Sequence, residues 1–285
     1  MRFATLRRRL HRLSHRNLTR SNPIVPPRDL AAWAAEFLLV EGKSASVPMR
    51  PENDMHRWLC GEFDRLDRER GQKLGVLGPR GYAKSSWGTY AYPLKCALNG
   101  TEPYIVLTSD TRPQAEKHLE AIRAAVETND KLQSAYSSNC RPGSVWRNDR
   151  LQLANGVVIE ALGTGMKLRG RRHLHHRPSL IGVDDPQNKD HIISQLQRER
   201  SWEWLMKDVC NAGGPRTNIF VMGTALHREC IVCKLPQTPG WKVRVWKAII
   251  EWPQRMDLWA EWERIYQDYD LADDERERKA LEFYA

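Results

Sequence analysis

The sequence predicts an α/β fold: a mainly parallel central sheet flanked by helices, with an antiparallel hairpin as an addition. Short apolar runs with strand character alternate with longer segments of helical period, which is the pattern of parallel strands joined by crossover helices. A glycine-rich turn joins one such run to a helical segment, and an Asn-Gly pair marks the hairpin. The expected strands are residues 74–77, 104–109, 179–183, 217–223 and 241–250, and the expected hairpin is 151–160.

Length and charge limit the kind of protein this can be. The 285 residues can bury a sizeable core in one large or two modest domains. Mean hydropathy is −0.63, and no apolar run approaches the roughly 18 residues of a membrane span. The formal net charge of +10 favours a polyanionic partner or a membrane surface. Residues 257–285 hold ten acids and four bases, a net charge of −6, which leaves +16 on the rest.

The uneven charge suggests three parts. Residues 1–24 contain seven arginines and no acid, a composition found in transit peptides, in arms that bind nucleic acid and in disordered termini. We expect a basic, flexible arm over 1–28, one domain over 29–255 and an acidic helical connector over 256–285. The six cysteines follow no secreted-disulfide spacing, so reduced thiols in a cytosolic compartment are expected.

Two helices are expected before the first strand. Residues 29–40 form an amphipathic pattern that Asp29 can cap. Residues 53–68 place four apolar side chains on one helical face, Met55, Leu59, Phe63 and Leu66.

The stretch from Leu74 to Ser86 has the order strand, glycine-rich turn, helix. Against the phosphate-loop pattern G-x-x-x-x-G-K-[ST], Gly78 fills the first position and Lys84 and Ser85 the last two. Ala83 replaces the second glycine, and because alanine carries a Cβ we expect it to keep an ordinary φ. In such a loop backbone N–H groups face phosphates, the lysine reaches the β- and γ-phosphates, and the serine hydroxyl binds Mg²⁺. A glycine-rich turn with a chance Lys-Ser pair is the other interpretation. The candidate nucleotide-binding residues are Gly78, Pro79, Arg80, Gly81, Tyr82, Ala83, Lys84, Ser85 and Ser86.

Further elements follow in order. Lys84 opens a helical segment that can run to residue 98, and a second begins after the strand 104–109, where Asp110 and Thr111 can cap a helix to residue 129. Asn155-Gly156 suits a type I′ hairpin turn. A helix is expected over about 190–210.

Two carboxylates follow the strand before that helix. Asp184 is placed to bind Mg²⁺ through Ser85 and water, and Asp185 is placed to orient an attacking water, as phosphoryl transfer requires. An ordinary strand followed by a polar Asp-Asp-Pro turn is the alternative.

Two further groups flank this pair. The loop 163–172 carries three candidate arginines, Arg169, Arg171 and Arg172, whose guanidiniums could stabilise γ-phosphoryl charge, contact DNA phosphates or stay solvated. At the end of the strand 217–223, Thr224 could sense the γ-phosphate, with His227 three residues on; a capping threonine and a surface histidine are the alternative.

Four pieces in this order resemble the ATPase domain of the large terminase subunit of tailed bacteriophages, the DNA-packaging motor. They are residues 79–85, 169–170, 177–186 and 223–227, and the resemblance covers about 56–252. It implies an additional-strand P-loop NTPase that uses ATP and Mg²⁺ and translocates double-stranded DNA into a procapsid. The implied partners are the portal protein, the small terminase subunit and further copies in a ring, a pentamer, in the host cell cytoplasm, with no membrane.

The resemblance also implies roles for single residues. Lys84 contacts phosphate, Ser85 and Asp184 hold Mg²⁺, and Asp185 is the catalytic carboxylate, although the family usually has Glu there. Arg80 matches a sensor of the γ-phosphate that acts in cis.

One of Arg169, Arg171 and Arg172 would act as a finger in the neighbouring subunit's site, and Thr224 belongs to the coupling motif. Whole terminases also carry a nuclease domain, but no further acidic cluster for a two-metal site follows here, so we expect no nuclease activity and interpret the chain as a motor domain. A helicase-like ATPase and a degenerate, non-hydrolysing nucleotide- or DNA-binding module remain alternatives.

Overall fold

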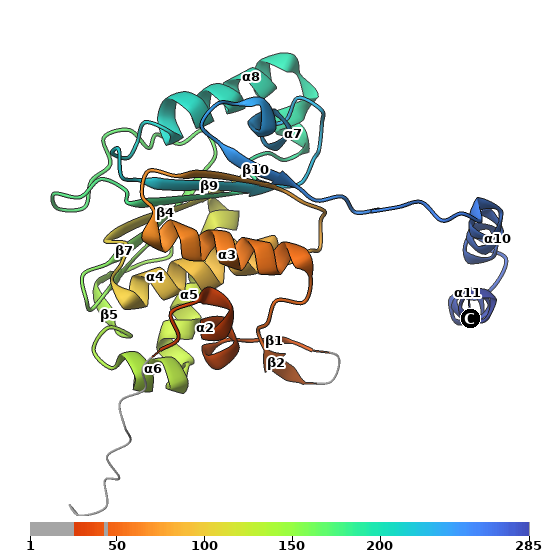
Figure 1. The fold of residues 1–285 in the computed structure, drawn as a ribbon, viewed down its shortest axis with the longest axis horizontal. Coiled ribbons are helices and arrows are strands. Elements are labelled where there is room, and N and C mark those ends of the chain that lie inside the picture. Colours follow the sequence, from red (N-terminus) through yellow and green to blue (C-terminus); the bar gives the residue numbers. More distant parts are fainter. Residues whose placement is uncertain (1–25, 43–44, 285) are drawn as a thin grey trace, which may run out of the picture. The chain divides into compact units, whose positions relative to one another are not determined.

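The computed structural model describes residues 26–42 and 45–284 (Figure 1). All but the last three residues of the arm expected over 1–28 lie outside this part. The chain divides into two compact units, residues 1–246 and 247–285.

An eight-stranded sheet forms the centre of the first unit (Figure 1). In spatial order its strands are β10 (Lys242–Val245), β3 (Lys73–Leu77), β9 (Asn218–Gly223), β8 (Leu180–Asp184), β4 (Tyr104–Ser109), β7 (Val158–Gly163), β6 (Arg150–Leu153) and β5 (Pro142–Trp146). The strands from β10 to β7 are parallel, whereas β6 and β5 are antiparallel. This confirms the mainly parallel sheet. One strand, β9, lies between the strand before the glycine-rich loop and the strand that ends in the two acids, which is the additional-strand arrangement.

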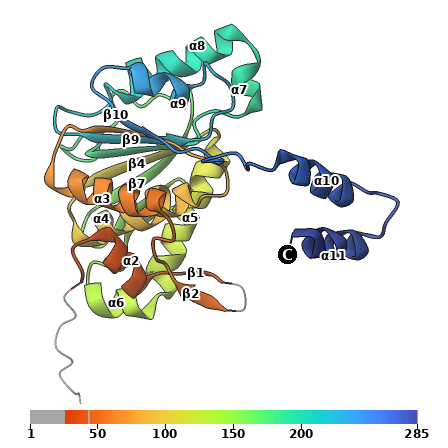
Figure 2. The ribbon, with the colours of Figure 1, turned by 45° about the vertical axis from the view of Figure 1, so that its right-hand side comes forward.

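Helices cover both faces of this sheet (Figures 1 and 2). One layer contains α2 (Leu30–Phe37), α3 (Asp54–Arg68), α4 (Tyr92–Asn99), α5 (Arg112–Thr128) and α6 (Asp130–Tyr136); the other contains α7 (Lys189–Ile193), α8 (Gln195–Glu203) and α9 (Ile231–Lys234). Strand residues alternate between the two cores: Ile105 and Leu107 of β4 pack with the first layer, and Tyr104 and Val106 with the second.

Side-chain caps fix the starts of the early helices. Asp29 Oδ1 accepts from the N–H of Ala32 at 2.8 Å, and Asn53 Oδ1 accepts from that of His56 at 2.9 Å. The first helix ends at Phe37 rather than at residue 40. The chain then becomes extended, and β1 (Leu39–Glu41) pairs with β2 (Ser46–Pro48) in a separate two-stranded antiparallel sheet.

Two expected elements differ from the structure. The helix expected over 190–210 is divided, because Ser194 leaves the helical conformation and caps α8, which then continues into a π-helical turn, Trp204–Val209. The strand expected over 241–250 is β10, which ends at Val245.

The hairpin turn also differs. Gly156 has φ +88°, but Asn155 is absent from the described residues with positive φ, so the turn is not type I′, which needs both. Asn155 instead donates to the carbonyl of Ala97 at 2.8 Å and accepts from the N–H of Val157 at 3.1 Å. These two hydrogen bonds of Asn155 stabilise a different turn geometry. Strand β7 also pairs in parallel with β4, so the hairpin is built into the central sheet.

The second unit contains a pair of helices, α10 (Met256–Tyr266) and α11 (Asp273–Tyr284), after a segment without helix or strand. Trp262 Nε1 donates to the carbonyl of Ala280 at 3.0 Å, and its ring stacks on Tyr266 at 4.9 Å between centroids. In the described parts of both units, the helices are too short or too polar to cross a membrane.

Candidate active site

Three neighbouring strands bring the predicted groups together. Because β3, β9 and β8 are parallel, their carboxyl ends lie at one edge of the sheet. There the N–H of Gly78 donates to the carbonyl of Gly223 at 3.0 Å, and the N–H of Asp185 donates to that of Met222 at 2.9 Å. The glycine-rich loop, the acid pair and the Thr224 segment, more than a hundred residues apart at the extremes, therefore form one site.

Lys84 lies at the centre of this site. Its side chain is only 5% exposed. The Nζ atom donates to the carbonyl of Pro79 at 2.7 Å and to Thr224 Oγ1 at 3.3 Å. Burial lowers the pKa of Lys84, and the carboxylates of Asp185 and Asp184 act against that shift. The lysine is thus held close to both acids with its charge partly desolvated.

The loop before Lys84 turns through the left-handed region twice. Gly81 has φ +79°, which glycine adopts without cost. Ala83 has φ +46°, so the expectation of an ordinary φ at this position is wrong. The helix that contains Lys84 starts directly after Ala83. The chain changes direction at Ala83 to enter this helix, and that constraint outweighs the preference of alanine for negative φ. A left-handed conformation costs a residue with a Cβ roughly 1–2 kcal/mol, so this part of the loop is strained.

The helix after the loop confirms the predicted helical segment from Lys84 and adds an irregularity. Residues Ser86–Ala91 form a π-helical turn before α4, and Thr89 Oγ1 donates to the carbonyl of Ser85 at 2.8 Å. Such turns occur frequently at functional sites.

Asp184 is almost completely buried at the end of β8, with 2% exposed. Its Oδ2 lies 3.3 Å from His118 Nε2. Its Oδ1 has no hydrogen-bond partner among the residues that the structure describes. Burial raises the pKa of Asp184 to about 7, against the lowering effect of the Ser85 hydroxyl. A buried carboxylate oxygen without a donor calls for a ligand that the protein itself does not provide.

Asp185 adopts an unusual backbone conformation. Its φ is +40° although Pro186 follows, and the residue before a proline normally prefers an extended conformation. Its Oδ1 accepts from the N–H of Thr224 at 3.0 Å. Non-glycine residues in the left-handed region cluster at active sites and switch regions, and this site holds two, Ala83 and Asp185.

His118 is a site residue that the sequence analysis missed. It lies on α5, three residues after Ala115 and four before Ile122, both buried in the core. Burial lowers the pKa of His118, and the charges of Asp185 and Asp110 act against that shift. Its helical spacing from Ala115 and Ile122 was the signal that could have found it, because this spacing predicts an inward-facing side chain.

The candidate arginines do not all meet at this edge. Arg80 is exposed on the loop, where its charge helps to lower the pKa of Lys84, behind the larger effect of burial. Arg169 Nε donates to the carbonyl of Lys207 at 2.7 Å. Arg171 Nη1 pairs with Glu160 Oε1 at 2.6 Å.

Within one chain, Arg169 and Arg171 therefore bind residues outside the glycine-rich loop. Arg172 is exposed, and its side chain has no hydrogen-bond or ion-pair partner in the described part of the chain.

The donor set fits a nucleotide with Mg²⁺. The described residues contain no group of three or more His, Cys, Asp and Glu that could hold a metal ion by themselves. Ser85 and the unmatched Asp184 oxygen would supply two ligands, and Mg²⁺ commonly takes one or two protein ligands together with phosphate oxygens and water.

Comparisons with known proteins identify the fold. No family model matches the sequence, and no curated protein matches it. Among solved structures, the crystal structure of the HK97 bacteriophage large terminase matches with a TM-score of 0.50 and 15% sequence identity, covering 89% of this chain and 50% of that chain. The chain thus spans about half the length of that protein. At this identity the match shows the fold alone: over most of its length this chain has a fold similar to part of that protein.

Proposed function

We propose that this chain is the ATPase domain of a large-terminase-type motor, which hydrolyses ATP with Mg²⁺ and translocates double-stranded DNA into a procapsid. The observation that carries the proposal is the meeting of Lys84, Asp184, Asp185 and Thr224 at the carboxyl edge of an additional-strand sheet. The similarity of the fold to the HK97 large terminase supports it.

The residues of the site have separable roles in this proposal. Lys84 holds the β- and γ-phosphates, for which its Nζ leaves the carbonyl of Pro79. Ser85 and Asp184 hold Mg²⁺, which when bound neutralises charge on the phosphates. Asp185 accepts a hydrogen bond from water: its Oδ1 already accepts from the N–H of Thr224, and its second oxygen has no hydrogen-bond partner among the described residues.

Thr224 links two of these groups and is therefore the proposed coupling residue. Its hydroxyl accepts from Lys84 and its N–H donates to Asp185. If either side chain moves as the γ-phosphate is lost, the segment after β9 loses a hydrogen bond. This gives hydrolysis a direct route to movement of residues 224–227.

The motor proposal includes partners. They are DNA, the portal protein, the small terminase subunit and other copies of this chain in a ring, in the cytoplasm of the host cell. Arg172 is the arginine that we propose as the trans finger, because Arg169 and Arg171 are engaged within the chain.

A steady-state ATPase assay with and without DNA tests this function. Lys84→Ala should abolish hydrolysis, and Asp185→Asn should bind ATP yet hydrolyse it poorly, because an amide cannot accept the proton of the attacking water. Lys189→Ala, which removes an exposed lysine on α7, is the matched control. Near-full turnover by Lys84→Ala would contradict the assignment, and an inactive wild type would favour a non-hydrolysing module.

The ring is tested in the same assay. Turnover per chain should rise with protein concentration, and Arg172→Ala should remove this rise, since fingers supplied in trans contribute roughly 10³–10⁵ in rate elsewhere. Stimulation by portal protein separates the packaging motor from a helicase-like ATPase. A concentration-dependent rise that survives in Arg172→Ala would exclude this finger.

A further inference from the structure

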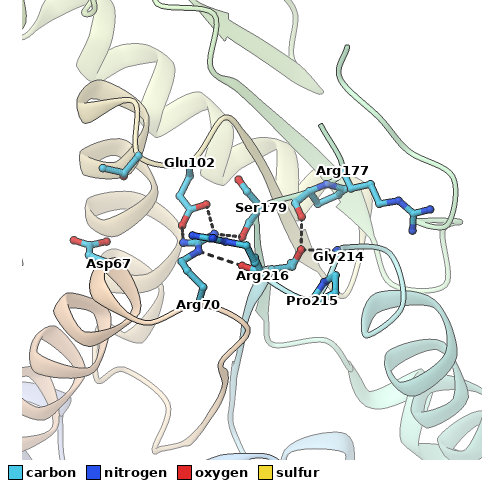
Figure 3. Close-up of a pocket in the computed structure, with 11 residues that line it drawn as sticks. Asp67, Arg70, Glu102, Arg177, Ser179, Gly214, Pro215 and Arg216 are labelled. Atoms are coloured by element: carbon cyan, nitrogen blue, oxygen red, sulfur yellow. Dashed lines mark hydrogen bonds and ion pairs between the residues drawn. The ribbon is translucent and has the colours of Figure 1, made fainter. Parts of the chain in front are cut away.

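Figure 3 shows a pocket of the first unit, with a volume of about 580 Å³. It lies at the edge of the central sheet opposite to the site of Lys84. Its lining includes residues just before parallel strands: Glu102 two residues before β4, Ser179 directly before β8 and Thr217 directly before β9. Because amino ends of parallel strands share one edge, the pocket is separate from the loop that contains Lys84. None of the predicted site residues lines it.

Arg70 forms a fixed floor for this pocket. Its guanidinium pairs with both carboxylate oxygens of Glu102, a residue that is 1% exposed. It also donates to the carbonyl of Ser179 at 2.9 Å and to that of Arg216 at 3.1 Å. Figure 3 shows Arg70, Glu102 and Ser179 meeting at the centre of the pocket. All of the charge on Arg70 is thus compensated, and its position is held by three segments.

The rim has a different charge balance. Arg177 and Arg216 are exposed, and neither guanidinium has a hydrogen-bond or ion-pair partner in the part of the chain that the structure describes. The remaining carboxylate of the pocket, Asp67, accepts from Lys95 Nζ at 2.7 Å. Lys95 also lies 3.4 Å from Asp64, so it does not neutralise Asp67 completely. With three arginines and two acids, the charged residues of the lining carry a net charge of +1, and its two exposed guanidiniums are the free positive groups.

We propose that this pocket is a second phosphate-binding site, which takes a backbone phosphate of duplex DNA. Guanidiniums suit phosphate oxygens because their N–H groups form a planar fork. The two rim arginines come from separate segments and are open to solvent, which suits a long polyanion that passes over the pocket. The net charge of +16 outside residues 257–285 attracts the same ligand. The choice of DNA as the source of the phosphate rests on the proposed function.

Binding of a fluorescent, unspecific DNA duplex to the full chain, measured by anisotropy at several salt concentrations, tests the site. Arg177→Gln and Arg216→Gln should each lower the slope of log K against log salt by about 0.9, which corresponds to a roughly eightfold loss of affinity at 0.1 M salt. Arg200→Gln is the matched control, because it removes one exposed arginine on α8 outside the pocket. It should change the slope less. Arg216→Lys, which keeps the charge, should restore most of the slope.

Two further measurements separate the causes of a negative result. The binding assay contains no ATP, so its result does not depend on whether the chain hydrolyses ATP. Where turnover of ATP without DNA is measured, it should be the same in the rim variants as in the wild type. Inorganic pyrophosphate in calorimetry probes small phosphates directly. Wild-type DNA affinity in both rim variants, an equal loss in Arg200→Gln, or a rim-dependent response to pyrophosphate alone would each overturn the assignment to DNA.

Discussion

At the amino edge of the central sheet, the buried side chains of Asn218, Arg70 and Glu102 are well supplied with hydrogen-bond partners, whereas at the carboxyl edge the buried Asp184 is not. At the amino edge, Asn218 donates to the carbonyls of Leu66 and Glu69 and accepts from the N–H of Gln72. The guanidinium of Arg70 likewise donates to the carboxylate of Glu102 and to the carbonyls of Ser179 and Arg216. At the carboxyl edge, Asp184 keeps an oxygen without a partner among the described residues, and Ala83 and Asp185 adopt left-handed φ.

The difference separates stability from function within one sheet. Satisfied buried polar groups stabilise the fold, whereas strained or unmatched groups persist only where the surroundings hold them in place. The buried groups of the amino edge should therefore respond to substitution mainly in stability, unlike the exposed arginines of the pocket rim. The carboxyl edge should lose activity, and at some positions should gain stability.

The largest effect is expected at the amino edge. Arg70→Ala leaves Glu102 buried and unpaired, and removing one partner of a buried pair costs roughly 3–5 kcal/mol of unfolding free energy. Urea denaturation measures this loss. Arg68→Ala, which removes an exposed arginine at the end of α3, is the control and should change stability by less than about 0.5 kcal/mol. Equal effects of the two substitutions would remove the contrast between the edges.

At the carboxyl edge, Asp184→Asn should stabilise the protein in the presence of a metal chelator. The pKa of Asp184 is about 7 in the folded chain, above the ordinary 3.8, so the folded state binds the proton more tightly than the unfolded state. The free energy of unfolding of the wild type should therefore fall as pH rises from about 4 to above 7, by up to about 4 kcal/mol.

The asparagine variant lacks this titration and should show a flatter profile. Urea denaturation at pH 5 and pH 8 measures both proteins. Parallel profiles would show that the Asp184 carboxylate is not destabilised by burial.

The strands, the glycine-rich loop and the acid pair could be predicted from sequence because each depends on local pattern. Strands β3 and β8 are short apolar runs, and their parallel order, with β9 between them, places Lys84 and Asp184 at one edge. The pairs that hold the site and the opposite pocket could not be predicted. Arg70 and Glu102 are 32 residues apart, and charged residues of this kind are normally solvated.

The backbone conformation at single residues also could not be predicted from the sequence. The sequence shows alanine at position 83, and its intrinsic preference predicts an ordinary φ. The loop geometry imposes +46° instead. Ser194 likewise divides a helix that periodicity alone predicts as continuous, because its side chain accepts from the N–H of Gln197 and starts a new helix. In both cases the backbone conformation of one residue depends on the surrounding fold.

His118 provides a more moderate test of the carboxyl edge. If its Nε2 holds Asp184 in place, His118→Ala should raise the Mg²⁺ concentration needed for half-maximal ATPase activity about tenfold, because Asp184 loses the polar contact that its Oδ2 makes with the imidazole at 3.3 Å. His118→Gln keeps an N–H donor and should restore most of this loss. A purely structural role would instead lower stability in both variants without changing the Mg²⁺ dependence.

The smallest effect is expected from Ala83→Gly, and its sign is the informative part. Glycine adopts φ +46° without steric cost, so the substitution removes a strain of roughly 1–2 kcal/mol. The greater conformational freedom of glycine in the unfolded chain lowers the free energy of unfolding by about 0.5–1 kcal/mol. The net expectation is a gain of about 0.5–1 kcal/mol in urea denaturation.

Ala121→Gly, the same substitution at an exposed helical position in α5, should lose about 1 kcal/mol. If both variants lose stability, the backbone at Ala83 is not strained. Opposite signs would locate stored strain in the residue before Lys84, at the edge of the sheet where we propose that ATP is bound.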